Sequence, residues 1–489
     1  MGKTGKIMVA FFAIFLGIMF YSVASKTLDP DFGWHLQVGR ILWEKGIPET
    51  DPFSYTMPSF PWVDHGRWSD VAIAKIYEFS GMMGLSLVSS IIILLALAVA
   101  IPRPLWTWSF VPLMLGAGVL VTRSGIRPQI EDWLILSVLL RILFNEQWWR
   151  KWRWFVPVGF AIWANLHGGF VMGYGVMATS LSVGWLQKKK IIWKDAVVMV
   201  LSVIATLVNP YGISLWHEVW LTLSDTHLRF SIAEWMPFYT KVEMGMWLLT
   251  AMILAVVRTK FHSFKLSRLV VLAVLFAAGL SSLRNTPLYI LIAVPIVAEW
   301  TKDLYDSLRG NEEATRRAKI FYGILIAIAV SVFAVESGVP FWKIATGRWL
   351  QYPEAAVTYL NLNKRDFEGR LFSSYGWGGY LIWKLPKEKV FIDGRMPSWR
   401  WKAPAGESDW AFKDYEKIIK GEFEEQFEKY NIRMVLWNKE VKQVETGGWL
   451  IDLFVKDEKL DKSFLEKLKE KGWTEVYQDD LAVIYERGS

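Results

Sequence analysis

The chain has 489 residues, of which 53% are hydrophobic, and it contains 29 tryptophans. Together with a mean hydropathy of +0.24, this composition excludes an average soluble domain and indicates a multi-spanning membrane protein. Cysteine is absent, which excludes disulfides, thiolate metal sites and cysteine nucleophiles. The net charge of +8 does not indicate a nucleic-acid partner, because the Lys and Arg residues lie mostly in short loops between apolar segments.

A membrane-spanning helix needs about 20 mostly apolar residues, although a helix buried in a bundle can be shorter. One apolar stretch, 154–186, fits either one long tilted helix or two spans with a bend at 165–169. The basic clusters 150–153 and 188–190 fall on the same side of the membrane only with two spans, which the positive-inside rule favours. We therefore predict eleven spans, at 6–25, 82–101, 105–121, 129–145, 153–166, 168–186, 194–209, 244–258, 267–282, 287–303 and 318–337.

The same rule orients the chain. With Lys3 and Lys6 in the cytoplasm, the basic loops all fall on the cytoplasmic side. The other side receives the loop 26–81, the later polar loops and everything after about residue 340. We expect a multi-pass protein of the cell (inner or plasma) membrane, with a transmembrane domain over 1–340 and an extracytoplasmic domain over 341–489.

The composition changes after the last span. From about Tyr352 charged residues become more frequent and apolar runs shorter, which indicates a soluble domain of roughly 140 residues. Short apolar runs alternate with charged helical stretches, a pattern typical of an α/β domain. The fold class predicted for the whole chain is a polytopic α-helical membrane protein of about eleven transmembrane helices with a C-terminal soluble α/β domain. In that domain we expect strands at 370–373, 390–392 and 434–437, helices at 410–430 and 462–471, and a final hairpin ending at 483–485.

The loop after the first span carries an acid pair, Asp29 and Asp31, followed by Trp34 and His35. Two such carboxylates can hold a divalent cation through oxygen ligands. Alternatively, one acts as a general base whose pKa the other adjusts, or one caps the helix that begins near His35. If the pair binds a metal, Mg²⁺ or Mn²⁺ is the expected ion, and no further cofactor is indicated.

Three arginines, Arg123, Arg127 and Arg284, lie at the extracytoplasmic boundary, where basic residues are disfavoured. A guanidinium binds phosphate through a fork of donors, so these residues predict a site for a lipid-linked phosphate or diphosphate. The alternative is that they extend to the membrane interface or pair with nearby acids. The candidate acids are Glu131, Asp132 and Glu234.

Further polar and aromatic residues share this face. His35 follows Asp31 by four positions, so both can lie on one helix face. No pair of histidines has metalloprotease spacing. Tryptophans in the first loop (Trp34, Trp62 and Trp68) are suited to stack on a sugar ring or to sit at the membrane interface. The residues expected to bind substrate are Trp34, His35, Asp64, His65, Asn165 and His167.

Several short motifs surround these residues. In the first loop they are Asp29-Pro30-Asp31-Phe32-Gly33-Trp34-His35, Pro48-Glu49-Thr50-Asp51-Pro52 and Pro61-Trp62-Val63-Asp64-His65. Later ones are Arg127-Pro128-Gln129, Asn165-Leu166-His167-Gly168-Gly169, Asn209-Pro210-Tyr211-Gly212, Arg284-Asn285, Tyr375-Gly376-Trp377-Gly378-Gly379-Tyr380 and Asp393-Gly394-Arg395. With the large first outer loop and the C-terminal domain, these motifs resemble a prokaryotic group within the GT-C superfamily of membrane glycosyltransferases. The resemblance spans most of the chain and is strongest in the first loop.

The resemblance implies transfer of a sugar from a polyprenyl-phosphate or polyprenyl-diphosphate donor to a glycan, lipid or protein acceptor on the extracytoplasmic face. An acid of the pair, preferably Asp31, would deprotonate the acceptor hydroxyl, or both acids would hold a metal. The three arginines would neutralise the departing phosphate. The chain lacks the Trp-Trp-Asp signature of oligosaccharyltransferases, so the resemblance does not extend to transfer onto protein asparagine. The C-terminal motifs, 376–379 and 393–395, would cover the site or hold the acceptor.

Two other classes of protein fit the same spans. A transporter or flippase of polyprenyl-linked substrates would need ionisable residues in mid-span or paired repeats. A non-enzymatic membrane scaffold would need no acid pair. In each case the expected partners are membrane lipids and not nucleic acid, and the sequence does not specify the sugar, the acceptor or the oligomeric state.

Overall fold

The computed structural model describes residues 3–240, 243–260, 265–308, 310–345, 352–363, 369–439 and 464–488. The chain divides into two compact units. The first, here called the helical unit, comprises Met1–Thr27, Ser80–Trp216 and Arg229–Trp349. The second, the loop–sheet unit, comprises Leu28–Phe79, His217–Leu228 and Leu350–Ser489. Most of the predicted loop 26–81 therefore belongs to the same unit as the C-terminal residues.

A helix coincides with each of the eleven predicted spans. Three are long and apolar enough to cross a membrane, over Val9–Lys26, Arg67–Ala100 and Glu312–Gly338, which supports a membrane location; the number of crossings stays a prediction. The bounds are α1 Lys3–Lys26, α3 Arg67–Ala100, α4 Phe110–Arg123, α5 Gln129–Phe144, α7 Val156–Leu166, α8 Phe170–Lys188, α9 Trp193–Thr206, α12 Met244–Lys260, α13 Leu266–Ser281, α14 Thr286–Leu308 and α15 Glu312–Ala345. Shorter helices are α6 Glu146–Trp152, α10 Ser214–Ser224 and α11 Thr226–Ser231.

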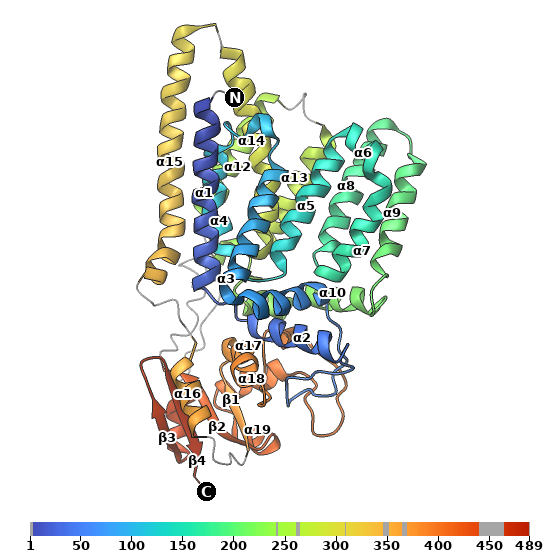
Figure 1. Ribbon diagram of the computed structural model, residues 1–489. Helices are drawn as coiled ribbons and strands as arrows, with labels where there is room; N and C mark the ends of the chain where they lie inside the picture. The colour runs from blue at the N-terminus through green and yellow to red at the C-terminus, as the bar shows by residue number, and fades with distance from the viewer. Residues whose placement is uncertain are drawn as a thin grey trace. The chain divides into compact units, whose positions relative to one another are not determined.

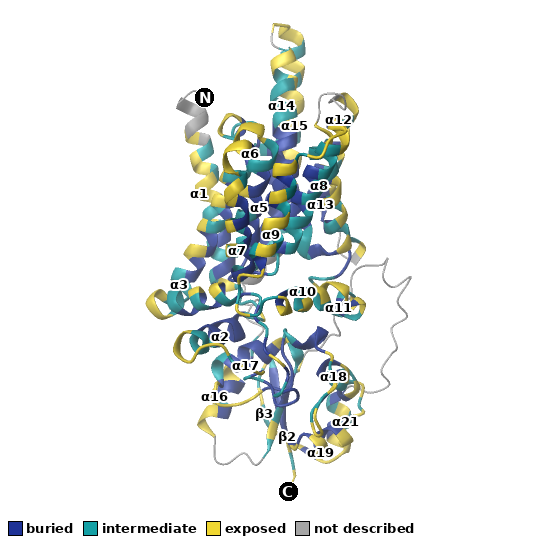
Figure 2. Cartoon of the chain, turned by 90° about the vertical axis from the view of Figure 1, so that its right-hand side faces the viewer, coloured by how far each residue is buried: buried dark blue, intermediate teal, exposed yellow. Residues whose placement is uncertain are grey.

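The core of the helical unit is formed by α4 and α14. Every residue of α14 from Thr286 to Ala298 is buried, and α4 packs against α12, α14 and α15 (Figure 1). Gly116 of α4 leaves room for the side chain of Ile290. Many residues of α1 and α9 are exposed (Figure 2). They include the apolar Phe11 and Val200. Such exposed apolar faces are suited to contact lipid.

The chain breaks between α7 and α8 at His167–Gly169, where His167 has an extended backbone with φ −164 and ψ 154. This break confirms the prediction of two helices instead of one long helix over 154–186. A second change of direction occurs within α3 at Gly81, whose φ of 63 lies in the left-handed region that favours glycine. Gly81 lies next to the point where the chain passes from the loop–sheet unit into the helical unit.

The loop–sheet unit contains a small mixed sheet in the order β1-β2-β4-β3. Strand β1 pairs with β2 in parallel, and β4 pairs antiparallel with both β2 and β3. The strands are β1 Arg370–Ser373, β2 Ile432–Asn438, β3 Trp473–Gln478 and β4 Ala482–Arg487. The helices are α2 Phe32–Glu44, α16 Glu354–Leu362, α17 Gly378–Lys384, α18 Ala411–Ile419, α19 Glu424–Lys429 and α21 Phe464–Glu470.

Aromatic rings fill the core beneath this sheet. Phe372 of β1 is fully buried and stacks on Trp437 of β2, with ring centroids 5.7 Å apart. The predicted strands at 370–373 and 434–437, the helix within 462–471 and the final hairpin are all confirmed. The predicted helix over 410–430 is two helices, because Gly421 has a φ of +93 between α18 and α19.

The predicted strand at 390–392 is wrong. Val390 makes only an isolated bridge, with Ser54. The Val390 amide donates to the carbonyl of Phe53 at 2.9 Å, and its carbonyl accepts from the Tyr55 amide at 3.1 Å. The apolar run 390–392 is buried as the sequence suggests, but its hydrogen bonds go to the first loop and not to the sheet.

Candidate active site

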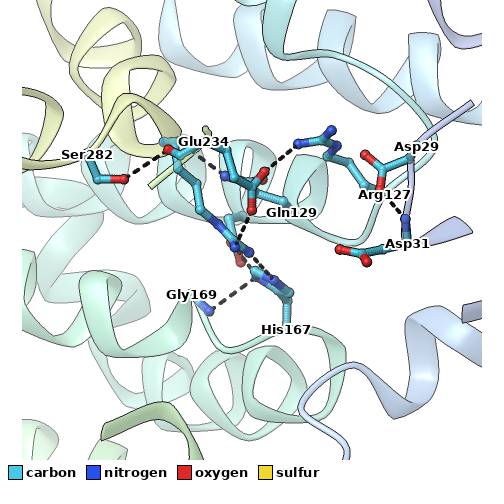
Figure 3. A network of polar contacts seen from close by, with 10 residues as sticks. Asp29, Asp31, Arg127, Gln129, His167, Gly169, Glu234 and Ser282 are labelled. Carbon is cyan, nitrogen blue, oxygen red and sulfur yellow. Dashed lines mark hydrogen bonds and ion pairs between the residues drawn. The ribbon is translucent and has the colours of Figure 1, made fainter. Parts of the chain in front are cut away.

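The acid pair lies at the start of α2. Asp29 Oδ1 accepts a hydrogen bond from the backbone amide of Asp31 at 2.9 Å (Figure 3). Asp31 occupies the N-cap position, but its carboxylate makes no capping hydrogen bond within the described helix. The local backbone is therefore stabilised by Asp29, and the helix-capping interpretation does not account for Asp31.

The donor set around the pair bears on the metal hypothesis. Mg²⁺ and Mn²⁺ take about six ligands, mostly oxygens. Within the described part of the chain, no group of three His, Asp or Glu residues is placed to hold a metal ion. Mg²⁺ usually keeps several waters and is held by one or two carboxylates together with substrate phosphates, so a metal at Asp29 and Asp31 stays a prediction.

The side chain of His35 contacts Asp70, whereas the helical spacing suggested Asp31 as the partner acid. Its Nδ1 lies 2.5 Å from Oδ1 of Asp70, a residue in the first turn of α3. Asp70 also lies close enough to Asp64 to influence its charge, and all three side chains are buried. Burial, followed by the neighbouring Asp70, raises the pKa of Asp64 well above its usual range. His65 lies half-buried in the turn that precedes α3.

A buried arginine, Arg395, joins the first loop to the C-terminal residues. Its guanidinium donates to Asp51 Oδ1 at 2.7 Å and to Asp393 Oδ1 at 2.7 Å. Trp34 and Trp62 cover it, with ring centroids 5.8 and 5.3 Å from its Cζ. Both tryptophans are more than nine-tenths buried, so the predicted open stacking surface is not formed by them, and only Trp68 is exposed.

In the helical unit, Arg127 and Arg284 converge on one carboxylate. Arg127 Nη1 donates to Glu234 Oε2 at 3.1 Å, and Arg284 Nη1 donates to Glu234 Oε1 at 2.9 Å (Figure 3). Burial raises the pKa of Glu234, but the surrounding arginines outweigh it and hold the pKa below its usual range. Two guanidiniums share one carboxylate, so Arg127, Arg284 and Glu234 together carry one net positive charge.

His167 extends the cluster. Its Nε2 lies 3.3 Å from Nη2 of Arg284, and its Nδ1 lies 2.6 Å from Asp132 Oδ2. Because arginine can only donate, Nε2 is the acceptor in the contact with Arg284. Asp132 also accepts from the Trp163 indole at 2.7 Å. His167 therefore orients Arg284.

Two other predicted residues have structural partners. Arg123 Nη2 donates to Glu243 Oε1 at 2.7 Å, and both side chains are largely buried. Asn165 Nδ2 donates to the carbonyls of Ala161 and Val208, at 2.9 and 2.8 Å. Asn165 thus ties the end of α7 to the residues that follow α9.

Residues that sequence reasoning did not single out complete both clusters. Asp70 and Asp51 are fully or almost fully buried acids. Asp51 lies within the proline-rich part of the first loop, and Asp70 follows that loop in the first turn of α3. A carboxylate beside buried tryptophans is a signal for a buried ion pair or a shared proton. For Glu234 the sequence predicts only a pairing with the arginines, as the alternative to their binding of phosphate.

No protein-family model and no curated protein sequence matches the chain. Two solved structures are similar to it. The oligosaccharyltransferase of Archaeoglobus fulgidus, in its apo form, is 12% identical with a TM-score of 0.57, over 88% of this chain and 69% of that one. ArnT of Cupriavidus metallidurans, bound to undecaprenyl phosphate, is 14% identical with a TM-score of 0.53, over 99% of this chain and 98% of that one. Both are GT-C glycosyltransferases, and the chain therefore has the GT-C fold.

Proposed function

We propose that the protein is a glycosyltransferase that moves a sugar from a polyprenyl-phosphate donor to an acceptor hydroxyl on the extracytoplasmic side of a membrane. The observation that carries the proposal is the fold shared along nearly the whole chain with ArnT, whose structure contains undecaprenyl phosphate. The three long apolar helices of the described residues and the break at His167–Gly169 fit that class of protein.

In this reaction Asp31 accepts the proton of the acceptor hydroxyl. The acceptor oxygen forms a bond to the anomeric carbon of the sugar while the bond from that carbon to the donor phosphate breaks. A single displacement of this kind inverts the configuration at the anomeric carbon. Asp31 is preferred over Asp29 because the Asp29 carboxylate is used in the backbone turn before α2.

Arg127 and Arg284 stabilise the charge that develops on the departing phosphate. Each donates through Nη1 to Glu234, and this approach of two guanidiniums to one carboxylate supports the role. Arg123 is a weaker candidate for this role, because its charge is matched by the buried Glu243. Lost donors at such a position cost several kcal/mol of transition-state stabilisation, on the order of 3 kcal/mol each.

The test uses radiolabelled polyprenyl-phosphate sugars extracted from bacterial membranes, with the purified protein in detergent, with and without a chelator. The native protein is expected to remove label from the lipid fraction. Asp31→Asn is expected to bind undecaprenyl phosphate normally but to lose transfer. Arg284→Ala is expected to bind that lipid roughly 10- to 100-fold more weakly, because charged hydrogen bonds are lost.

Arg268→Ala is the matched control, since Arg268 forms an ion pair with Glu299 elsewhere in the helical unit. Native transfer rates in Asp31→Asn would remove Asp31 from the role of base. Movement of intact lipid across liposomes without loss of sugar would favour a transporter instead. Loss of activity with the chelator would support the metal hypothesis for Asp29 and Asp31.

A further inference from the structure

The starts of α2 and α17 approach each other at backbone distance within the loop–sheet unit. A methyl group at Gly33 would overlap the carbonyl of Gly379, and a methyl group at Gly379 would overlap the carbonyl of Pro30. Each of these obstacles is main chain, which cannot rotate away as a side chain can. The two glycines are therefore required for the close contact between the two helices.

The first turn of α17 also contacts the segment that follows the buried run 390–392. A methyl group at Gly378 would overlap the carbonyl of Ile392 and lie 2.8 Å from Cβ of Asp393. Two neighbouring glycines thus place α17 between the Asp29–Asp31 turn and the Asp393-Gly394-Arg395 motif. The edge-to-face contact of Phe32 with Trp383 supports the same arrangement, with ring centroids 5.3 Å apart.

The carboxylate of Asp31 occupies the space that a side chain at position 394 would need. A methyl group at Gly394 would overlap Asp31 Oδ1 and lie 2.8 Å from its Cγ. Gly394 does not have a positive φ, so alanine fits its backbone. The three atoms nearest to such a methyl group all belong to the Asp31 carboxyl group.

The segment around Gly394 is anchored on both sides. Arg395 donates through its backbone amide to Asp393 Oδ1 at 3.0 Å and through Nη1 to Asp51 at 2.7 Å. The side chains of Asp51 and Asp393 are fully buried, and that of Arg395 is 5% exposed. Because buried, multiply bonded charges resist displacement, Gly394 has little freedom to yield.

We propose that Gly394 is a positioning residue for Asp31, and that the C-terminal Asp-Gly-Arg motif sets where the carboxylate of the base lies. This inference rests on the proposed function. It assigns to residues 393–395 a role in the chemistry itself, namely the orientation of Asp31, rather than a role in covering the site or holding the acceptor.

Gly394→Ala tests the proposal, with Gly323→Ala as its control. Gly323 is an exposed residue of α15 in the helical unit, and a methyl group there would meet nothing within 4 Å. Displacement of a catalytic group by about 1 Å costs on the order of 100-fold in rate. We therefore expect Gly394→Ala to lower kcat about 100-fold with unchanged binding of undecaprenyl phosphate and a nearly native Tm, and Gly323→Ala to behave like the native protein. Native kcat in Gly394→Ala overturns the proposal.

A second measurement covers the case in which Gly394→Ala is unstable. The Tm of Gly394→Ala is compared with the native protein, and the Tm of Asp31→Ala/Gly394→Ala with Asp31→Ala. If the methyl group collides with the carboxylate, truncation of Asp31 removes the collision. The Tm of Asp31→Ala/Gly394→Ala is then close to that of Asp31→Ala. Equal losses of Tm in both backgrounds overturn the proposal.

The outcomes separate this inference from the proposed function. Asp31→Asn that transfers sugar at the native rate refutes the role of Asp31 as base, whatever Gly394→Ala does. If Asp31→Asn is inactive and Gly394→Ala is fully active, Asp31 keeps its role as the base. Only the positioning role of Gly394 is then refuted.

Discussion

Two acids, the buried Asp64 of the loop–sheet unit and the half-buried Glu234 of the helical unit, have their pKa values shifted in opposite directions. Burial and the adjacent Asp70 raise the pKa of Asp64. Burial acts in the same direction on Glu234, but Arg284, Arg127 and Arg123 lower its pKa below the usual range. Burial alone therefore does not fix the charge of a carboxylate, because the sign of the neighbouring charges decides the direction of the pKa shift.

The two regions also differ in how they are held. The first loop, residues 26–81, is here called the acid loop. It is fixed by buried hydrogen bonds, by aromatic rings around Arg395 and by glycine contacts at backbone distance. The arginine cluster is fixed by ion pairs whose side chains are 21 to 28% exposed. Partly exposed ion pairs are screened by salt, whereas steric contacts are not. The acid loop should therefore be sensitive to single methyl groups, and the arginine cluster to charge and ionic strength.

Removal of the buried cation should break the acid loop most strongly. Arg395→Ala leaves Asp51 and Asp393 buried without their counter-charge, which costs about 3–5 kcal/mol of folding free energy. We expect a large fall in Tm and proteolysis of the first loop in detergent. Arg433→Ala is the control, because Arg433 is an exposed residue of β2 in the same unit. Equal Tm values for the two variants would contradict the anchoring role of Arg395.

The raised pKa of Asp64 predicts a pH dependence of stability. The folded protein holds the Asp64 proton more tightly than the unfolded chain, so its contribution is complete below the unfolded pKa. That contribution falls as the pH rises toward the folded pKa, by at most about 1.4 kcal/mol per pH unit. Asp64→Asn keeps a donor toward Asp70 and removes the titration. Its Tm should match the native value in acid and exceed it increasingly at higher pH; parallel Tm–pH curves would show that Asp64 does not titrate in this range.

Glu234→Gln tests whether the arginine cluster is sensitive to charge and salt, and it has the smallest expected effect. Glutamine leaves both guanidiniums without their shared carboxylate and adds one unit of net positive charge. We expect undecaprenyl phosphate to bind about five-fold more tightly at low salt, equivalent to about 1 kcal/mol, with the gain lost at high salt. Weaker binding at all salt concentrations would mean that Glu234 orients the arginines and that their charge is not limiting.

The helices could be predicted from the sequence because long apolar runs between basic loops leave few alternatives. The bend at 165–169 followed from the positions of two basic clusters, and α7 ends where that bend was expected. The strand at 390–392 was mispredicted because its hydrogen-bond partners come from the first loop. Thr56 Oγ1, for example, donates to the Phe391 carbonyl at 2.7 Å across 335 residues of sequence. No local pattern contains such a pairing.

The candidate site could be predicted in part. The acid pair and the arginines stand out because charged residues are rare beside membrane spans. The partner of His35 could not be predicted, because helical spacing favours Asp31 four positions away and the observed Asp70 lies on another helix. The steric contact between Gly394 and Asp31 was likewise out of reach, since a glycine in a turn is explained equally well by the turn.

The division of the chain into two units has a consequence for biosynthesis. The acid loop is translated early, yet its partners, such as Trp383, whose carbonyl accepts from Gln37 across 346 residues, are translated near the end. Because contacts at such long separation form slowly, the loop has to remain unpaired while most membrane helices are being inserted. A chain interrupted near residue 350 would insert its helices without an ordered acid loop, so maturation of the protein depends on completion of its last quarter.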